Sequence, residues 1–586
     1  MRLIKYRFSV LVTALSLAGM TMWMVAPTLA QRAPSGDWPS HNLDLRNSRH
    51  SPLDAINTSN VSRLTQQWSI QADPKDVIRQ VTPLVIDGVM YYDAGSKLFA
   101  VDGATGAVIW THQVDPPFAG SGRGPTYADG IIYAYGGPYG GNVLYAVDAK
   151  TGRALPSFGS KGRLLVANEV LKFKYPNKDA IGYRMVGPPT YLNGTLYVGL
   201  SQSEKHIPGG LVAAMDAKTG AVKWVFSTIP QGPTDDGWEI AKDTWIGGQR
   251  VGGGIWTQPA IDPELGLIYF NAGNPSPDYE GTARHGINLF TNSIIALRLD
   301  TGKLAWYFQT IHHDLWDWDL VTGPVLFDIN SGGETIKGVG SAGKNCFLYL
   351  FNRANGEPIN PIVETAVRTI SDVPGEQVWP TQPYPYTAKG VPMTPFCATF
   401  PMVQDRAKAS RARPMFYPYS TKEFFTVSHG GSSFGSLSFS PRTSLVYVTG
   451  KNAALSFTVK VVGDTLREGQ GDGHAATILK RDHDYGVPAT EVVSAYNPVS
   501  GELVWQHEHP STTNISSAGN LVTAGDLVFQ GADTGELCAL DARDGKELFK
   551  TKVPRGVASS PITYTAKGKQ YVAFVATNAI HVFSLP

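Results

Sequence analysis

The chain has 586 residues, and 50 basic side chains nearly balance 49 acidic ones, so the formal net charge is +1. No basic stretch is long enough to follow a phosphate backbone, which argues against a nucleic acid partner. With 62 Gly and 40 Pro, the composition is typical of short strands joined by many turns.

The N-terminus has the form of a secretory signal. Met1–Ala30 begins with three basic residues, continues with the apolar stretch Phe8–Val25 and ends on small residues before Gln31. Because that apolar stretch approaches the length needed to span a bilayer, an uncleaved anchor is the alternative. Both interpretations imply export, so we expect a periplasmic protein with residues 31–586 as one mature domain.

Three cysteines are spread widely along the sequence. Cys346, Cys397 and Cys538 leave at least one thiol unpaired and provide no disulfide framework. The sequence contains no Cys-x-x-Cys-His, so a covalently attached haem is not expected.

A turn motif recurs along the chain. In Asp102–Gly106 the Asp accepts hydrogen bonds from the turn backbone, the Gly adopts positive φ, and Trp110 follows on the next strand. Such a Trp can cover the adjacent sheet. The motif glycines are Gly106, Gly152, Gly220, Gly302, Gly356, Gly501 and Gly545.

The spacing of these copies predicts an all-β propeller. Gly106 and Gly152 are 46 residues apart, and blades of four strands have roughly 40–50 residues. An eighth blade would pair the strand around Leu64–Ile70 with C-terminal strands that include Pro561–Tyr564 and Gln570–Ala576. That closure removes exposed sheet edges, so we expect eight blades, with seven as the alternative.

Two segments after the third motif copy, Gly220, have candidate functional residues. Gly252-Gly253-Gly254 precede Trp256, and Asn274 follows eighteen residues later, between a strand and two prolines. The glycines can present a flat aromatic face, and a fixed amide oxygen is a good ligand for a hard cation. The alternative is a blade turn with a packed Trp.

The segment His312–Asp319 concentrates two histidines, three carboxylates and two tryptophans. On a strand, Asp317 and Asp319 would share one face and the tryptophans the other. Carboxylates this close need a cation, a hydrogen-bond network or a raised pKa. The alternative is an exposed, solvated loop, which the alternation with tryptophan argues against. Glu204 lies in a loop after the strand at 195–198, where a Glu is normally just solvated. Only the other two segments make it a candidate functional residue.

Together these segments resemble the pyrroloquinoline quinone (PQQ)-dependent dehydrogenases, eight-bladed propellers that include methanol, ethanol and membrane glucose dehydrogenases. The resemblance extends from Trp38 to Val572 and includes the turn-and-Trp repeats as tryptophan-docking motifs. It implies one metal ion on Glu204, Asn274, Asp317 and Asp319. It also implies Asp317 as catalytic base and Trp256, Lys344 and Arg123 as contacts of the quinone.

Several positions depart from the family pattern. Pro117-Phe118 stand where the methanol and ethanol enzymes have a vicinal disulfide, and Gln80 replaces a Glu near the cofactor carboxylates. Ser433 occupies a position often held by Asn, and Ser517 one often held by Trp. We therefore expect a different lid over the site.

The resemblance implies a periplasmic dehydrogenase that transfers hydride from an alcohol, polyol or sugar hydroxyl to metal-activated PQQ. Calcium is the default metal, while Asp319 resembles the extra carboxylate of lanthanide-dependent members. Without a haem motif, the electrons would pass to an external cytochrome c or to membrane quinone. The alternatives are a non-catalytic propeller scaffold of the outer-membrane assembly type and a degenerate binder without turnover.

Overall fold

The computed structural model describes residues 36–73, 78, 80–117, 122–136, 141–180, 182–200, 208–247, 250–397, 413–428, 430–463, 478–482, 489–512 and 518–586. The expected signal Met1–Ala30, Phe118, Glu204 and Ser517 lie outside these ranges. Contacts group Ala33–Pro586 into one compact unit.

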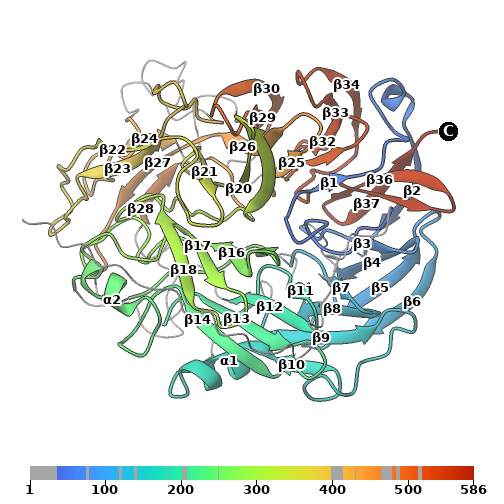
Figure 1. Cartoon of the computed structure of the whole chain (residues 1–586), viewed down its shortest axis with the longest axis horizontal. Helices are drawn as coiled ribbons and strands as arrows, with labels where there is room; N and C mark the ends of the chain where they lie inside the picture. Colours follow the sequence, from blue (N-terminus) through green and yellow to red (C-terminus); the bar gives the residue numbers. More distant parts are fainter. Residues whose placement is uncertain are drawn as a thin grey trace, which may run out of the picture. The chain divides into compact units, whose positions relative to one another are not determined.

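Eight antiparallel sheets follow one another around a ring, as Figure 1 shows. The first three blades are β3 (Leu84–Ile86), β4 (Val89–Ala94), β5 (Lys97–Asp102) and β6 (Val108–Gln113); β7 (Thr126–Ala128), β8 (Ile131–Gly136), β9 (Val143–Asp148) and β10 (Arg163–Leu165); and β11 (Thr190–Leu192), β12 (Thr195–Leu200), β13 (Leu211–Asp216) and β14 (Val222–Ser227). The next two are β15 (Ala260–Asp262), β16 (Leu267–Asn271), β17 (Ser293–Arg298) and β18 (Leu304–Gln309); and β19 (Val325–Ser331), β20 (Glu334–Ala342) and β21 (Leu348–Asn352).

The sixth blade comprises β25 (Ser438–Ser440), β26 (Leu445–Asn452), β29 (Thr490–Tyr496) and β30 (Leu503–Pro510). The seventh comprises β31 (Leu521–Thr523), β32 (Leu527–Gly531), β33 (Glu536–Asp541) and β34 (Glu547–Lys552), with β1 (His50–Ser51) added parallel to β31. The fold class predicted from the motif spacing, an eight-bladed propeller, is confirmed.

The last blade joins the two ends of the described chain. β2 (Thr65–Gln71) pairs antiparallel with β37 (Ala579–Ser584), next to β36 (Lys569–Ala576) and β35 (Ile562–Ala566). In Figure 1 the red C-terminal strands lie directly beside the blue β2. This arrangement confirms the predicted sharing of the eighth blade, which leaves no open sheet edge at the seam.

Each motif Trp packs on the glycine of the following motif. The indole N–H of Trp306 donates to the Arg353 carbonyl at 3.0 Å, and its ring covers Gly356. A Cβ placed on Gly356 would lie 2.7 Å from that ring, so the glycine is required for docking as well as for its φ of 79°. The same pairs form at Trp68–Gly106, Trp110–Gly152, Trp224–Gly302 and Trp505–Gly545.

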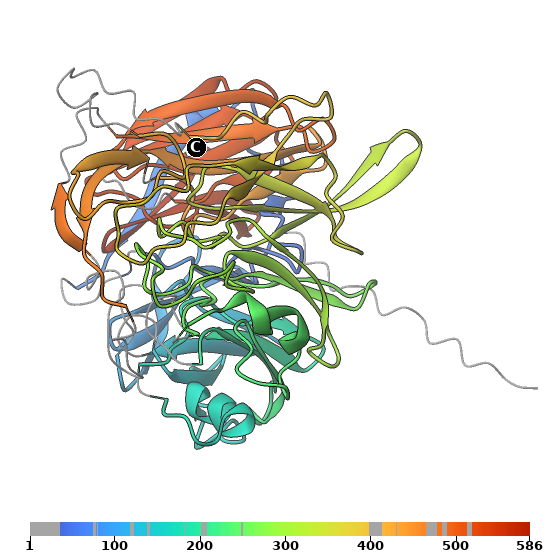
Figure 2. The same ribbon diagram turned by 90° about the vertical axis from the view of Figure 1, so that its left-hand side faces the viewer.

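The long intervals between motif glycines contain the additional elements. Between Gly356 and Gly501 lie the hairpin β22 (Ile362–Ala366) and β23 (Thr381–Pro385) and a sheet of β24 (Phe425–Ser428), β27 (Ala454–Val459) and β28 (Ile478–Asp482). Earlier intervals contain α1 (Val166–Lys174), α2 (Trp238–Ala241) and the 3₁₀ turn Lys242–Thr244; another 3₁₀ turn, Val61–Arg63, precedes β2. Both views place α1 at the periphery of the ring (Figure 1, Figure 2). Within the described ranges, no helix combines the length and apolarity needed to cross a bilayer.

Candidate active site

The segment His312–Asp319 forms an irregular loop after β18, so the strand considered from its sequence is wrong. The predicted alternation nevertheless holds. The rings of Trp316 and Trp318 stack with their centres 5.3 Å apart, whereas Asp317 and Asp319 both face Lys344. Asp317 has a φ of 58°, a left-handed conformation that departs from a strand. Such backbone strain costs about 1–3 kcal/mol and concentrates at functional sites.

Asp314 organises this loop from within. Its two carboxylate oxygens accept the backbone N–H groups of Trp316 and Trp318 at 2.7 and 2.9 Å. The side-chain amide of Asn292 donates a third hydrogen bond at 3.0 Å. Burial raises the pKa of Asp314 to about 7. Of the three carboxylates in the segment, this one therefore has a structural role.

Lys344 lies between the other two carboxylates. Its ammonium group is 2.9 Å from Asp317 Oδ1 and 2.6 Å from Asp319 Oδ2, and all three side chains are largely buried. Burial by itself lowers the pKa of Lys344, but the two carboxylates outweigh that effect and raise the pKa above its ordinary value. The structure thus brings together three residues that the sequence places up to 27 positions apart.

Asn274 joins this group from the loop after β16. Its backbone N–H donates to Asp319 Oδ1 at 2.8 Å, and its amide nitrogen donates to the Pro275 carbonyl at 2.9 Å. Its Oδ1 is buried and has no hydrogen-bond donor among the described residues. A buried acceptor without a donor is costly, and an amide oxygen beside carboxylates is a suitable ligand for a hard cation.

Trp256 and Arg123 border the same region. The Lys344 ammonium lies 5.5 Å from the centre of the Trp256 ring, and the Arg123 guanidinium donates to the Trp256 carbonyl. Arg123 is 2 % exposed, and among the described residues its Nε has no acceptor and no carboxylate forms an ion pair with its guanidinium. Burial lowers its pKa to about 10. A buried, unpaired guanidinium fits an anionic ligand.

Two supporting residues were not singled out in the sequence. Arg284, fully buried, donates to the carbonyls of Pro277, Glu280 and Asp314, so it ties the loop of Asn274 to the loop before Asp317. The Tyr279 hydroxyl lies 3.3 Å from Asp317 Oδ2. Both follow Asn274 within ten residues, but only their tertiary contacts give them a role.

Among the departures from the family pattern, Ser433 lies close to the site. It is buried beside Phe434, whose ring lies 4.7 Å from the Arg123 guanidinium. The preceding Gly431 approaches the Lys344 backbone so closely that a Cβ would lie 2.3 Å from its carbonyl oxygen. Gln80 is half-buried, two residues before Thr82, whose N–H donates to the Arg123 carbonyl.

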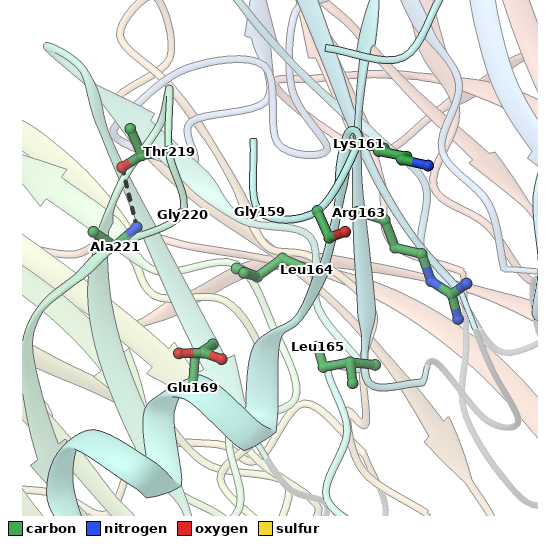
Figure 3. A pocket seen from close by; sticks show the side chains of 10 residues that line it. Gly159, Lys161, Arg163, Leu164, Leu165, Glu169, Thr219, Gly220 and Ala221 are labelled. Carbon is green, nitrogen blue, oxygen red and sulfur yellow. Dashed lines mark hydrogen bonds between the residues drawn. The ribbon is translucent and has the colours of Figure 1, made fainter. Parts of the chain in front are cut away.

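A hollow of about 800 Å³ lies elsewhere, between the second and third blades (Figure 3). It opens where the second blade lacks its motif Trp, and Leu164 covers Gly220 in place of an indole. The lining shares no residue with the site described above; it comprises Gly159, Ser160, Lys161, Arg163, Leu164, Leu165, Glu169, Thr219, Gly220 and Ala221.

The fold and this group of residues define a β-propeller dehydrogenase, and comparison with known proteins agrees. The family model for the glucose/ethanol/alcohol dehydrogenase β-propeller domain, PQQ, matches residues 38–483 and 506–572. The dehydrogenase subunit of the quinone alcohol dehydrogenase of Komagataeibacter europaeus is 31% identical over 598 residues, which cover 94% of this chain and 73% of that protein.

Solved structures give the same result. The quinohemoprotein alcohol dehydrogenase of Comamonas testosteroni superimposes with a TM-score of 0.71 at 25% identity, covering 95% of this chain and 81% of that one. A europium-containing methanol dehydrogenase has a TM-score of 0.70 at 23% identity over 94% of this chain and 99% of that one, a likeness of fold alone.

The chain therefore belongs to the PQQ-dependent glucose/ethanol/alcohol dehydrogenase family. It is an oxidoreductase that oxidises an alcohol group with PQQ, as the resemblance in the sequence implied. This membership favours the enzyme over the non-catalytic scaffold.

Proposed function

We propose that this protein is a periplasmic dehydrogenase that oxidises the hydroxyl of an alcohol, polyol or sugar at the site formed by Asn274, Asp317, Asp319 and Lys344. The observation that carries the proposal is the pair of buried carboxylates bridged by Lys344 beside the donor-free Oδ1 of Asn274. A purely structural ion pair would not require that orphaned oxygen.

The oxygen atoms fit a hard cation. Asn274 Oδ1, Asp317 and Asp319 would hold one Ca²⁺ or lanthanide ion, since such ions take amide and carboxylate oxygens. Glu204, which lies outside the described residues, is the proposed fourth protein ligand. Asp319, fully buried, gives the site a second carboxylate, and higher ligand charge favours a trivalent ion.

The surroundings fit a flat, anionic quinone. Trp256 would stack on it, Arg123 would pair with its carboxylates, and Lys344 would contact its oxygens. When bound, PQQ supplies the hydride acceptor and the cation polarises it as a Lewis acid.

Asp317 would act as general base on the substrate hydroxyl. Its Oδ1 faces Lys344 and its Oδ2 lies 3.3 Å from the Tyr279 hydroxyl, so both neighbours orient the carboxylate. A carboxylate held in this way can accept the hydroxyl proton as the carbinol hydrogen leaves. General base catalysis typically contributes about 10²–10⁴-fold to the rate.

The Cys346–Cys397 disulfide supports an exported protein. The sulfurs join residues separated by 51 positions, while Cys538 is buried and free. Disulfides persist in oxidising compartments such as the periplasm. The reduced cofactor would then pass its electrons to an external cytochrome c or to membrane quinone. Cell fractionation tests this location, and a cytoplasmic protein with reduced Cys346 would contradict it.

The test of function uses purified protein loaded with PQQ and either Ca²⁺ or La³⁺. Dye reduction is followed with a panel of alcohols, polyols and aldoses. We expect turnover with at least one substrate class and retained quinone absorbance after gel filtration. Absorbance without turnover would show the degenerate binder, and the loss of both would refute the cofactor assignment.

Two variants test the roles of the carboxylates. Asp317→Asn should retain quinone absorbance but lose about 10²–10⁴-fold in turnover, whereas the exposed Asp54→Asn should behave as wild type. Asp319→Ala should lose any preference for La³⁺ over Ca²⁺ first. An active Asp317→Asn enzyme, or an unchanged La³⁺ response without Asp319, would show that the assignment is wrong.

A further inference from the structure

Two histidines interrupt the apolar face of an outer strand far from the quinone site in sequence. On β30, Trp505 docks on the seventh blade, and the next residues on the same face are His507 and His509. On β14 and β18 the position two residues after the docking Trp is Phe226 or Phe308, both packed in apolar clusters. The imidazoles therefore replace an apolar contact at this interface between blades.

The seventh blade places one candidate metal ligand, Glu547, opposite these histidines. One ligand atom from each of His507, His509 and Glu547 lies within 4.8 Å of the others, and His507 Nε2 is 3.6 Å from Glu547 Oε2. Two ligand atoms about 2.0–2.2 Å from one tetrahedral ion are about 3.3–3.6 Å apart, which matches the distance between His507 and Glu547. Figure 1 places β30 and β34 as neighbouring outer strands at the rim of the ring.

One further contact matches the surroundings of bound metal ions. Glu536 Oε1 lies 3.1 Å from His509 Nδ1, and metal-bound histidines typically donate their second N–H to a carboxylate.

The position is also accessible. The side chains of His507 and Glu547 are 22% and 32% exposed, whereas His509 is 2% exposed and fixed. Cys538 Sγ lies 3.4 Å from His509 Nε2, the ring nitrogen that does not face Glu536. Lys550, 3.9 Å from Glu547 Oε2, is half-exposed and can remain on Glu536 when a cation binds.

We propose that His507, His509 and Glu547 bind one divalent transition-metal ion of the Zn²⁺ class, which clips the sixth blade to the seventh. Imidazole nitrogens select such ions over Ca²⁺ and lanthanides, which prefer oxygen. This site is distinct from the one that contains Asn274 and Asp317, with which it shares no residue. Because the ion would bind only the folded interface between the sixth and seventh blades, it would raise the stability of the folded ring.

The experiment titrates Zn²⁺ into the full-length protein after chelator treatment and resaturation with Ca²⁺, by calorimetry. We expect one zinc per chain and a higher melting temperature with Zn²⁺. His507→Ala and Glu547→Gln, both at partly exposed positions, should abolish this binding, and Glu536→Gln should weaken it by about 10–100-fold.

The matched control is His112→Ala. His112 also stands two residues after a docking Trp, on β6, but its ring contacts the Gly152 carbonyl, and it belongs to no group of three metal-binding side chains among the described residues. It should bind zinc as wild type does, and His507→Ala should keep dye-reduction activity. Zinc binding unchanged in His507→Ala and Glu547→Gln, or no zinc bound by the wild type, would overturn the proposal, whatever the outcome at the quinone site.

Discussion

Replacing one motif glycine by alanine isolates the contribution of tryptophan docking to stability. Gly356 has a φ of 79°, and an added Cβ would lie 2.7 Å from two atoms of the Trp306 ring. The left-handed backbone costs an alanine about 1–2 kcal/mol. Overpacking against the buried indole adds about 1–3 kcal/mol. Gly356→Ala should therefore lower the free energy of unfolding by about 2–5 kcal/mol.

Gly568→Ala is the control for this substitution. Gly568 has nearly the same φ, 75°, but a Cβ there would meet no atom within 4 Å. Its substitution should cost only the backbone contribution, about 1–2 kcal/mol. The difference between the two variants then measures the steric contribution of Trp306.

The assay is equilibrium urea unfolding, in which a shifted midpoint at constant slope reports a change in stability. Gly356→Ala should unfold at clearly lower urea than Gly568→Ala. If the two variants lose equal stability, the Trp306 ring can move away from the added methyl group without loss of stability. Docking on the glycine would then not contribute to holding neighbouring blades together.

Three further outcomes follow from the structure. Asn274→Ala should raise the Ca²⁺ concentration needed for activity by about 10-fold or more, and an unchanged requirement would remove Asn274 from the metal site. Burial raises the pKa of Asp93 from 3.8 to about 7, so the folded protein holds a proton that the unfolded chain releases. Stability should therefore fall as the pH rises from about 4 to about 7, less steeply in Asp93→Asn; identical pH profiles would contradict this. Serine at both Cys346 and Cys397 should lower the free energy of unfolding by about 4 kcal/mol for the 51-residue loop, and an unchanged urea midpoint would refute that cost.

The sequence predicted the blades because their determinants are local. An Asp, a Gly and a Trp within nine residues define a turn, a positive φ and a docking side chain, wherever the chain goes next. The closure of the eighth blade also followed from the repeat, because an unpaired first strand with Trp68 needed a partner. Asn274, Asp317 and Lys344 became candidates because their neighbouring residues resemble a family pattern.

Other features could not be read locally. His312–Asp319 alternates like a strand, yet Asp314 binds its backbone N–H groups and makes it a loop. The Cys346–Cys397 bridge and the contact of Arg284 with the Asp314 carbonyl join distant positions. No local pattern distinguishes such pairs from the many others that a chain of this length allows.

The sequence by itself thus determined the eight-bladed ring and the residue types that metal and quinone chemistry require. Only the tertiary structure decided that Lys344 lies between Asp317 and Asp319, and that His507 and His509 meet Glu547 of the next blade. The reason is that each propeller blade folds from neighbouring strands, whereas both sites form where loops or faces of different blades meet. Those contacts depend on the packing of the whole ring.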